Sequence, residues 1–336
     1  MKKYLNRALI YKEWKVTYWI LTPLILFSSK AFMISLLINQ AKVQDELAYR
    51  IFFQMGISNY ITIILVILMS YIMMNVDRKD SARDLISYMP FNIKQRMVSR
   101  IAVGEFVIFL SCLMGFIINT IMYEGNIGHL GKEIRFEYIT FYLIISFLVY
   151  TIIYILFVYV QCLCKNEIFG VVLAAAILNL PVFMGELLYY FLRVRFYRFT
   201  YQLNSLTIRH YLSLPLNSKI INNKEYITGY KFVPSIIKLI IILAVICMLF
   251  ILFIKRVKFG EGMMLKTSPK KEKVFKVFSS ISIGIFAAKG LSGLLHRQEP
   301  LSIYAILVNI IFIIAVYFAY SQINKVIKLS NYMRGE

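Results

Sequence analysis

The chain has 336 residues, of which 60% are hydrophobic and 16% are charged. A soluble domain carries about 25% charged residues, so this composition excludes an ordinary soluble protein. The net charge is +21, from 38 basic and 17 acidic residues. Because the basic residues gather at the ends of apolar runs, membrane topology and anionic lipid explain them better than nucleic acid does. We therefore expect an all-α, polytopic transmembrane helical bundle in a plasma membrane.

The first segment, residues 1–17, combines five basic residues with one acid, Glu13, and with interleaved Tyr and Trp. This mixture suits the headgroup zone of a membrane and predicts a short interfacial helix ahead of the first span. No small-residue cleavage site closes the first apolar run, so we do not expect a cleaved signal peptide.

About eight apolar runs are long enough to predict membrane spans. They are residues 18–38, 60–76, 101–122, 138–162, 168–192, 233–254, 277–295 and 301–322. The seventh is the weakest, because Lys289 and several Gly and Ser residues dilute it. The positive-inside rule places both termini and the loops 77–100, 163–167 and 255–276 in the cytoplasm. The long loop 193–232 then lies outside, although it is basic.

The charged loop 77–100 lies between two apolar runs, and its pattern predicts a short helix, a break and a new helix. Asp80 or Ser81 can cap the first helix, and Pro90 ends it. Asn92 can cap the next helix, which begins IKQR and continues into the membrane. The first helix would present an apolar face with a charged rim to the cytoplasm, a shape that suits docking to a partner protein. The alternative is a solvated turn.

Ionisable residues inside spans are candidates for function, because burying a charge in lipid is costly. Lys30, Glu105 and Glu186 are such residues, and we place them as candidates on a translocation path. Glu186 paired with Lys30 or Lys238 would be one arrangement. The structural alternative is that Glu105 and Lys238 extend to the interface and that a neighbouring helix holds Glu186.

Enzyme motifs are absent from the sequence. It has no G-x-x-x-x-G-K-[ST] motif, so we do not expect the chain to bind ATP itself. The three histidines are scattered, without H-E-x-x-H, and no G-x-S-x-G is present. Cys162 and Cys164 form a C-x-C without a flanking histidine, which makes a zinc or disulfide site improbable. We expect no metal, no cofactor and no catalytic residue in this chain.

The sequence resembles the ABC-2 type permeases, the membrane subunits of bacterial ABC exporters, with the Ytr-like branch as the nearest. Three features carry the resemblance: the basic, aromatic start RALIYKEWKVTYWI; the loop DLISYMPFNIKQRMVSRIAVGE; and the large outer loop after the fifth span. In the loop, the residues similar to the family pattern are Leu85, Tyr88, Pro90, Phe91, Asn92 and Met97. The likeness covers roughly residues 1–254, and the outer loop is more basic than the family pattern.

The resemblance implies an organisation of the chain. Residues 1–17 would be the connecting helix, 18–254 the six-span core, 255–276 a basic cytoplasmic loop and 277–336 two additional spans with a cytoplasmic tail. The ATPase-coupling residues would be Arg83, Asp84, Leu85, Tyr88, Met89, Pro90, Phe91 and Asn92. A second coupling turn would be formed by Lys165, Asn166 and Glu167.

The resemblance also implies a function: ATP-driven export of an amphipathic peptide, drug or lipid-like substrate by alternating access, a role compatible with antimicrobial resistance. The partners would be a dimer of P-loop ATPase subunits, which would bind ATP and Mg²⁺, and a second permease subunit, identical or paralogous. Two alternatives remain open. One is a secondary transporter or channel, which would show internal repeats. The other is a non-transporting immunity or sensor protein that binds an antimicrobial peptide or lipid through outer-loop residues. Those residues would be Arg193, Arg195, Arg198 and Arg209.

Overall fold

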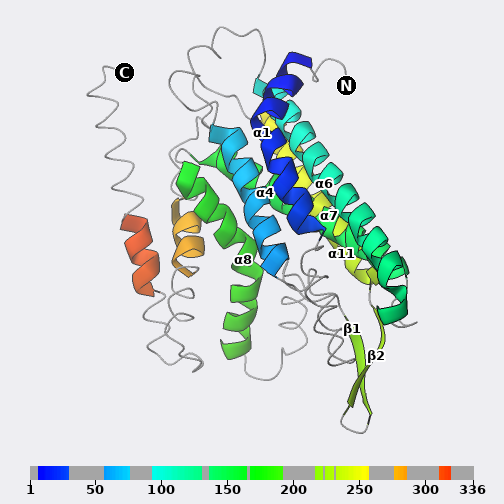
Figure 1. Ribbon diagram of the computed structural model, residues 1–336. Helices are drawn as coiled ribbons and strands as arrows, with labels where there is room; N and C mark the ends of the chain where they lie inside the picture. Colours follow the sequence, from blue (N-terminus) through cyan, green and yellow to red (C-terminus); the bar gives the residue numbers. More distant parts are fainter. Residues whose placement is uncertain are drawn as a thin grey trace. The chain divides into compact units, whose positions relative to one another are not determined.

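The computed structural model describes residues 7–29, 57–75, 93–130, 136–164, 167–191, 216–221, 224–230, 232–256, 276–285 and 310–318. Helices dominate this part of the chain (Figure 1). The labelled helices are α1 (Arg7–Ser28), α4 (Ile57–Asn75), α6 (Ile93–Leu130), α7 (Phe136–Leu163), α8 (Glu167–Phe191) and α11 (Phe232–Arg256). Further short helices cover Lys276–Ile285 and residues 310–318.

Several predicted helices are confirmed within a few residues, namely those now seen as α4, α7, α8 and α11. The predicted helix start after Asn92 is also confirmed, because α6 begins at Ile93. That start makes α6 longer than the expected span and places Arg100 inside the helix. Near the N-terminus, α1 runs without a break across residues 17 and 18. The predicted interfacial segment and the beginning of the first span therefore form one helix.

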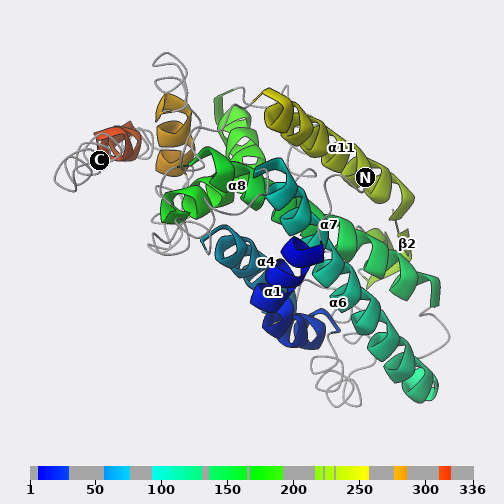
Figure 2. The same cartoon turned by 90° about the horizontal axis from the view of Figure 1, so that it is seen from above.

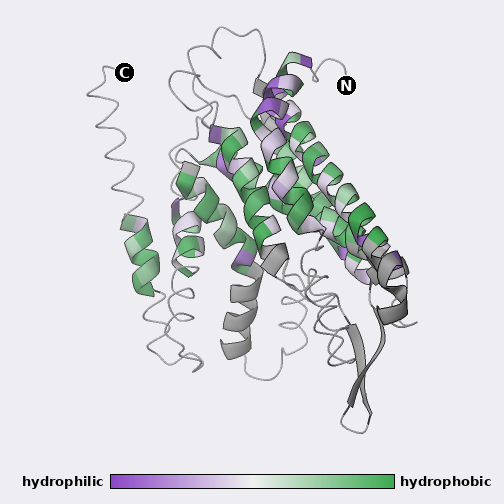
Figure 3. Ribbon diagram, in the orientation of Figure 1, coloured by the Kyte–Doolittle hydropathy of each residue, from purple (hydrophilic) through white to green (hydrophobic). Residues whose placement is uncertain are grey.

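Three helical stretches are long and apolar enough to cross a membrane within the described residues: Gln95–Ile121, Leu143–Leu163 and Val233–Leu252. Shorter apolar helices cover Ile61–Asn75, Ile168–Leu180 and Lys276–Ile285. In Figure 3 the hydrophilic residues of α1 gather in its first turns, whereas α6 is hydrophobic along most of its described length. These findings are compatible with a membrane protein, and the count of eight spans stays a prediction.

The chain divides into two compact units. Unit 1 comprises Met1–Glu167 and Ile208–Met264, and unit 2 comprises Ile168–Thr207 and Leu265–Glu336. In unit 1, α1 packs against α4 and α6, and α7 closes the group by packing against the same two helices (Figure 2). α11 packs against α7. In Figure 1, α1 and α6 both begin at the end of unit 1 where the N-terminus is marked.

The central helix of unit 1 is α7. Its residues 151–155 are all buried, and five consecutive residues of an α-helix point in every direction around its axis. α11, by contrast, has a broad exposed apolar face that includes Ile237, Ile241 and Met248. It meets α7 through an edge-to-face pair of Tyr159 and Phe250, with ring centroids 5.9 Å apart.

A β-hairpin lies in the segment predicted to be the outer loop. β1 (Leu216–Ile221) pairs antiparallel with β2 (Lys224–Tyr230), with Leu216 opposite Tyr230 and Ile221 opposite Lys224. A bulge interrupts the register between Asn217 and Ser218. The part of the chain that the structure describes is therefore helical with one small sheet, and the all-α expectation missed this hairpin.

In unit 2, Lys276–Ile285 and residues 310–318 lie against each other. A Cβ atom added to Gly284 would approach Cα of Ile313 to 2.7 Å, so the glycine allows close helix contact. Nζ of Lys276 lies 3.9 Å from the ring centroid of Tyr317. α8 is grouped with these segments rather than with the helices of unit 1.

Candidate functional site

A carboxylate interrupts the apolar face of α1. The buried residues of this helix are Leu9, Glu13, Thr17, Ile20 and Leu24, which recur at helical spacing and face the interior of unit 1. Glu13 retains only 2% of its exposure. Burying a carboxylate costs free energy of folding unless a cation or hydrogen-bond donors pair with it. The partner of Glu13 therefore determines how α1 packs against its neighbours.

The partner of Glu13 is Arg100 of α6. Arg100 is fully buried, and its Nε lies 3.3 Å from Oε1 of Glu13. Nη1 of Arg100 lies 3.6 Å from Sδ of Met74, in the last turn of α4. The backbone oxygen of Arg100 accepts a 2.9 Å hydrogen bond from the hydroxyl of Tyr154. One arginine thus contacts α1, α4 and α7 from its position in α6, and we call this group the arginine joint.

A glycine makes room for Tyr154 in the arginine joint. A Cβ atom added to Gly104 would overlap the phenol ring of Tyr154. The Tyr154 hydroxyl also lies 3.1 Å from Sδ of Met73 on α4. The ring is held between α4 and α6, and its hydroxyl fixes the backbone of α6 one turn from Gly104.

The arginine joint lies at the base of the predicted coupling loop. α4 ends at Asn75 and α6 begins at Ile93, so the chain between them leaves from beside Met74 and returns about two turns before Arg100. The helices on both sides of this segment are therefore joined by Arg100.

Further charges surround the Glu13–Arg100 pair. The pKa of Lys12 is lowered below its usual range, chiefly by burial. Glu13 opposes this shift, while the positive charges of Arg100 and Arg96 add to it. Lys12, Glu13, Arg96 and Arg100 thus interact as one group, which we call the charge cluster. It holds three cations against a single carboxylate.

Glu105, predicted as a translocation-path residue, faces α7. Its Oε2 accepts a 2.7 Å hydrogen bond from the hydroxyl of Thr151. Its Oε1 is buried and has no hydrogen-bond partner among the described residues. Glu105 also lies within Gln95–Ile121, one of the stretches apolar enough to cross a membrane. The carboxyl group is therefore held at one oxygen and free to bind at the other.

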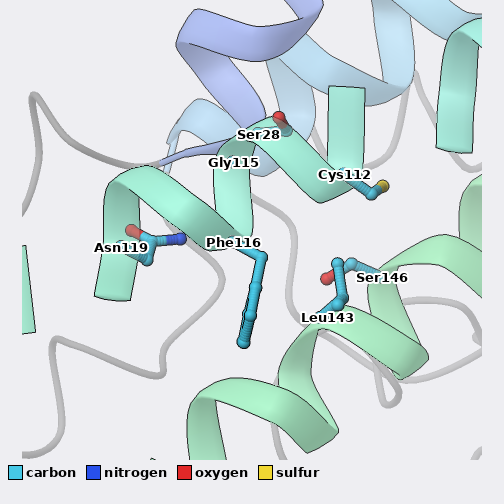
Figure 4. Close-up of a pocket in the computed structure, with 7 residues that line it drawn as sticks. All are labelled: Ser28, Cys112, Gly115, Phe116, Asn119, Leu143 and Ser146. Atoms are coloured by element: carbon cyan, nitrogen blue, oxygen red, sulfur yellow. The ribbon is translucent and has the colours of Figure 1, made fainter. Parts of the chain in front are cut away.

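A small cavity of about 20 Å³ lies farther along α6, which is room for about one water molecule. It is lined by Ser28, Cys112, Gly115, Phe116, Asn119, Leu143 and Ser146 (Figure 4). Oδ1 of Asn119 and Oγ of Ser146 are buried without hydrogen-bond partners in the described structure. The cavity has room for about one water and its lining includes polar side chains, so we assign it to hydration rather than to a substrate.

The cysteines near the end of α7 show no metal site. Cys162 and Cys164 are buried thiols that are not in disulfides, and Sγ of Cys162 lies 3.8 Å from Sδ of Met97. Within the described ranges, no three His, Cys, Asp or Glu side chains lie close enough to hold a metal ion.

Most of the predicted site residues lie outside the described residues. They are Lys30, Arg83, Asp84, Leu85, Tyr88, Met89, Pro90, Phe91, Asn92, Lys165, Asn166, Arg193, Arg195, Arg198 and Arg209. Glu167 is the first residue of α8 and Glu186 lies within it, but only their backbone positions are described. Among the predicted translocation-path residues, Glu105 has a described side-chain environment, and Lys238, named as a possible partner of Glu186, is exposed on α11. No sequence pattern pointed to the Glu13–Arg100 pair or to Tyr154.

Comparisons with known proteins found no relative from which a function could be inferred. No family model, curated protein or solved structure matches this chain.

Proposed function

We propose that the chain is the membrane subunit of an ATP-driven exporter and works with a separate ATPase subunit. The observation that carries this proposal is the arginine joint, which ties the two helices flanking the segment 76–92 to each other and to α1 and α7. A partner that pushes on this segment would move these helices together instead of bending one of them. Such rigid-body movement is what alternating access requires.

The proposed division of labour follows from the sequence. ATP and Mg²⁺ would be bound by the partner, because this chain has no phosphate-binding loop motif. The apolar helices would supply the bundle in the bilayer. Glu105, with one buried carboxyl oxygen left open, is the described residue best suited to contact a polar or cationic group of a substrate that passes between α6 and α7.

The test is purification of the tagged chain from its own host in mild detergent, followed by mass spectrometry of the copurifying proteins. We expect a P-loop ATPase in stoichiometric amount. Changing Leu85 and Tyr88 to Asp would place charges on the proposed docking face and should release the ATPase while the permease keeps its size-exclusion profile. The matched control changes Leu203 and Tyr211, in the predicted outer loop, to Asp and should leave the complex intact. Retention of the ATPase by the Leu85/Tyr88 variant would contradict the coupling assignment.

The β-hairpin favours one second candidate, a non-transporting protein that binds an antimicrobial peptide. Among the described residues, each strand of this two-stranded sheet has one edge without a strand partner, and an extended peptide can pair with such an edge. This function would require no ATPase. If the chain were purified alone even after crosslinking, and if removal of residues 216–230 abolished peptide binding, the second candidate would replace the exporter.

A further inference from the structure

The contact between α6 and α7 combines a carboxyl group with aromatic rings. Oε2 of Glu105 accepts its hydrogen bond from Thr151. One turn farther along α6, the ring of Phe109 meets that of Phe147 on α7 edge to face, with centroids 5.8 Å apart. Residues four positions apart lie on the same face of a helix, so these two contacts are neighbouring steps of one interface. We call these four residues the α6–α7 seam.

The α6–α7 seam reaches the surface of unit 1 in the described structure. Phe109 is 50% exposed, and Glu105 and Phe147 are each partly exposed, whereas Thr151 is buried. Glu105 also lies within Gln95–Ile121, a stretch apolar enough to cross a membrane. A ligand at the seam would therefore meet a carboxyl group in apolar surroundings, where electrostatic attraction is stronger than in water.

Among the described residues, no cation pairs with Glu105. The ionisable side chains that interact with it electrostatically are Cys112, Tyr154 and Cys247, from α6, α7 and α11. Thiols and phenols are never cationic, so none of the three supplies positive charge. Glu105 lies about 18 Å along α6 from Ile93, the first residue of the helix. A carboxylate in this position is stabilised by a cation that donates hydrogen bonds to it.

We propose that the α6–α7 seam binds an organic ammonium ion that carries an apolar group. The ammonium N–H groups would donate hydrogen bonds to Oε1 of Glu105 once its side chain turns outward. The apolar group would pack against the rings of Phe109 and Phe147. Binding requires only this chain. The further step, that such a cation is the exported substrate, rests on the proposed function.

The experiment uses the purified full chain in detergent and the probe phenylbutylammonium, with the ring and the amine at opposite ends of a butyl chain. Binding of the tritiated probe is measured by equilibrium dialysis at neutral pH. We expect saturable binding that phenylbutanol does not displace, since the alcohol has the same ring and chain without the positive charge. Displacement by phenylbutanol at equal concentration would overturn the proposal, because it would show that only the apolar group is recognised.

The role of the carboxyl group is tested by Glu105→Gln. This variant should lower the affinity for the probe roughly tenfold, because a hydrogen bond to a charged acceptor is stronger than one to an amide oxygen. The matched control, Glu124→Gln, makes the same change at an exposed position of the same helix and should leave the affinity unchanged. An unchanged affinity in the Glu105 variant would overturn the proposal. Equal losses in the two variants would overturn it as well, by showing general attraction of the cation to acidic residues.

The role of the rings is tested by Phe109→Leu, which should lower the affinity about threefold because it removes an aromatic packing partner. Phe106→Leu is the matched control. Phe106 is 53% exposed, but its ring pairs with Trp14 of α1, at a centroid distance of 6.0 Å, instead of with Phe147. This variant should keep the wild-type affinity. A larger loss for Phe106→Leu than for Phe109→Leu would place the apolar group elsewhere and contradict the proposed site.

A second measurement needs no variant. The probe should raise the thermal unfolding midpoint of the wild-type chain, since a ligand that binds only the folded state stabilises it, and phenylbutanol should not. Equal shifts with the two compounds would contradict the proposal. Neither measurement involves an ATPase, so the site and the exporter can fail separately. A chain that binds the probe but copurifies with no ATPase would retain the site and contradict the exporter.

Discussion

Two carboxylates that the structure describes in unit 1, Glu13 and Glu105, have opposite surroundings. Glu13 is paired with the guanidinium of Arg100, whose neighbours lie on α4 and α7. Glu105, five residues farther along α6 than Arg100, has only the hydroxyl of Thr151, and its other oxygen is unpartnered in the described structure. The first arrangement resists change because breaking it leaves a buried charge. The carboxylate of Glu105 can accept a further hydrogen bond at little cost. We therefore expect substitution of Glu13 to lower the stability of the fold, and substitution of Glu105 to lower the activity.

The largest expected effect follows from breaking the ion pair. Arg100→Met would leave the carboxylate of Glu13 buried without its cation and should destabilise the fold by about 3–5 kcal/mol. The double variant Glu13→Leu/Arg100→Met removes both charges and should recover most of that loss. Unfolding of the purified chain by titration with denaturing detergent measures both. If the double variant were as unstable as the single one, the pair would not be the source of the loss.

The next effect concerns the packing of Tyr154 in the arginine joint. Gly104→Ala would force the buried ring of Tyr154 away from α6 and should cost about 1–3 kcal/mol. Gly115→Ala is the matched control in the same helix. There the added Cβ meets Oγ of Ser28 at 2.9 Å and the backbone of Ser28 and Ser29 at 3.2 Å, whereas at Gly104 it would overlap the ring of Tyr154, so we expect a smaller loss at Gly115. Thermal unfolding of the two variants shows which substitution lowers the stability more. A larger loss of stability for Gly115→Ala would contradict this interpretation.

At Glu105 we expect a substitution to leave the stability unchanged or to raise it, in contrast to the losses expected above. Glu105→Gln keeps an oxygen that can accept the hydrogen bond from Thr151 and removes a charge from an apolar stretch. The variant should be as stable as the wild type or more stable by about 1 kcal/mol, while substrate-stimulated ATPase activity of the assembled complex should fall. Thr151→Val is the comparison, because it leaves the carboxylate without its donor and should destabilise the chain. A clear loss of stability in Glu105→Gln would assign this residue a structural role.

The smallest effect is expected at the hydrated cavity. Oγ of Ser146 has no hydrogen-bond partner among the described residues, so Ser146→Ala should change stability by no more than about 0.5 kcal/mol. Asn119→Leu would fill the cavity and exclude the water we assign to it. Thermal unfolding of both variants tests this, and a loss of several kcal/mol for Ser146→Ala would show that its hydroxyl has a structural partner.

The sequence predicted the helices better than their contacts. Pro90 and Asn92 located the start of α6 because capping chemistry is local. The Glu13–Arg100 pair joins residues 87 positions apart, and no local pattern connects them. The predicted charged loop 77–100 included Arg100, although the predicted helix start at Ile93 already placed this residue two turns inside the helix. Its position two turns inside a helix that continues into an apolar run indicated that the side chain of Arg100 would be buried.

The central position of α7 could not be predicted for a different reason. In a membrane bundle, lipid-facing and protein-facing residues are both apolar, so hydrophobic periodicity does not distinguish a central helix from a peripheral one. α7 and α11 are both strongly apolar in sequence, yet α7 is enclosed and α11 has an exposed face. The hairpin was missed because Asn- and Lys-rich segments such as LNSKII are atypical of strands.

The order of α1, α6 and α7 along the chain has a consequence for how the proposed membrane protein is made. Synthesis delivers Glu13 first, Arg100 next and Tyr154 last. The two opposite charges can therefore neutralise each other as soon as α6 leaves the ribosome, before the helix that will enclose them exists. Insertion would then proceed through a paired intermediate in which neither charge enters the lipid alone. α7 would close around a pair that is already formed, and Tyr154 would complete the assembly by bonding to the backbone of Arg100.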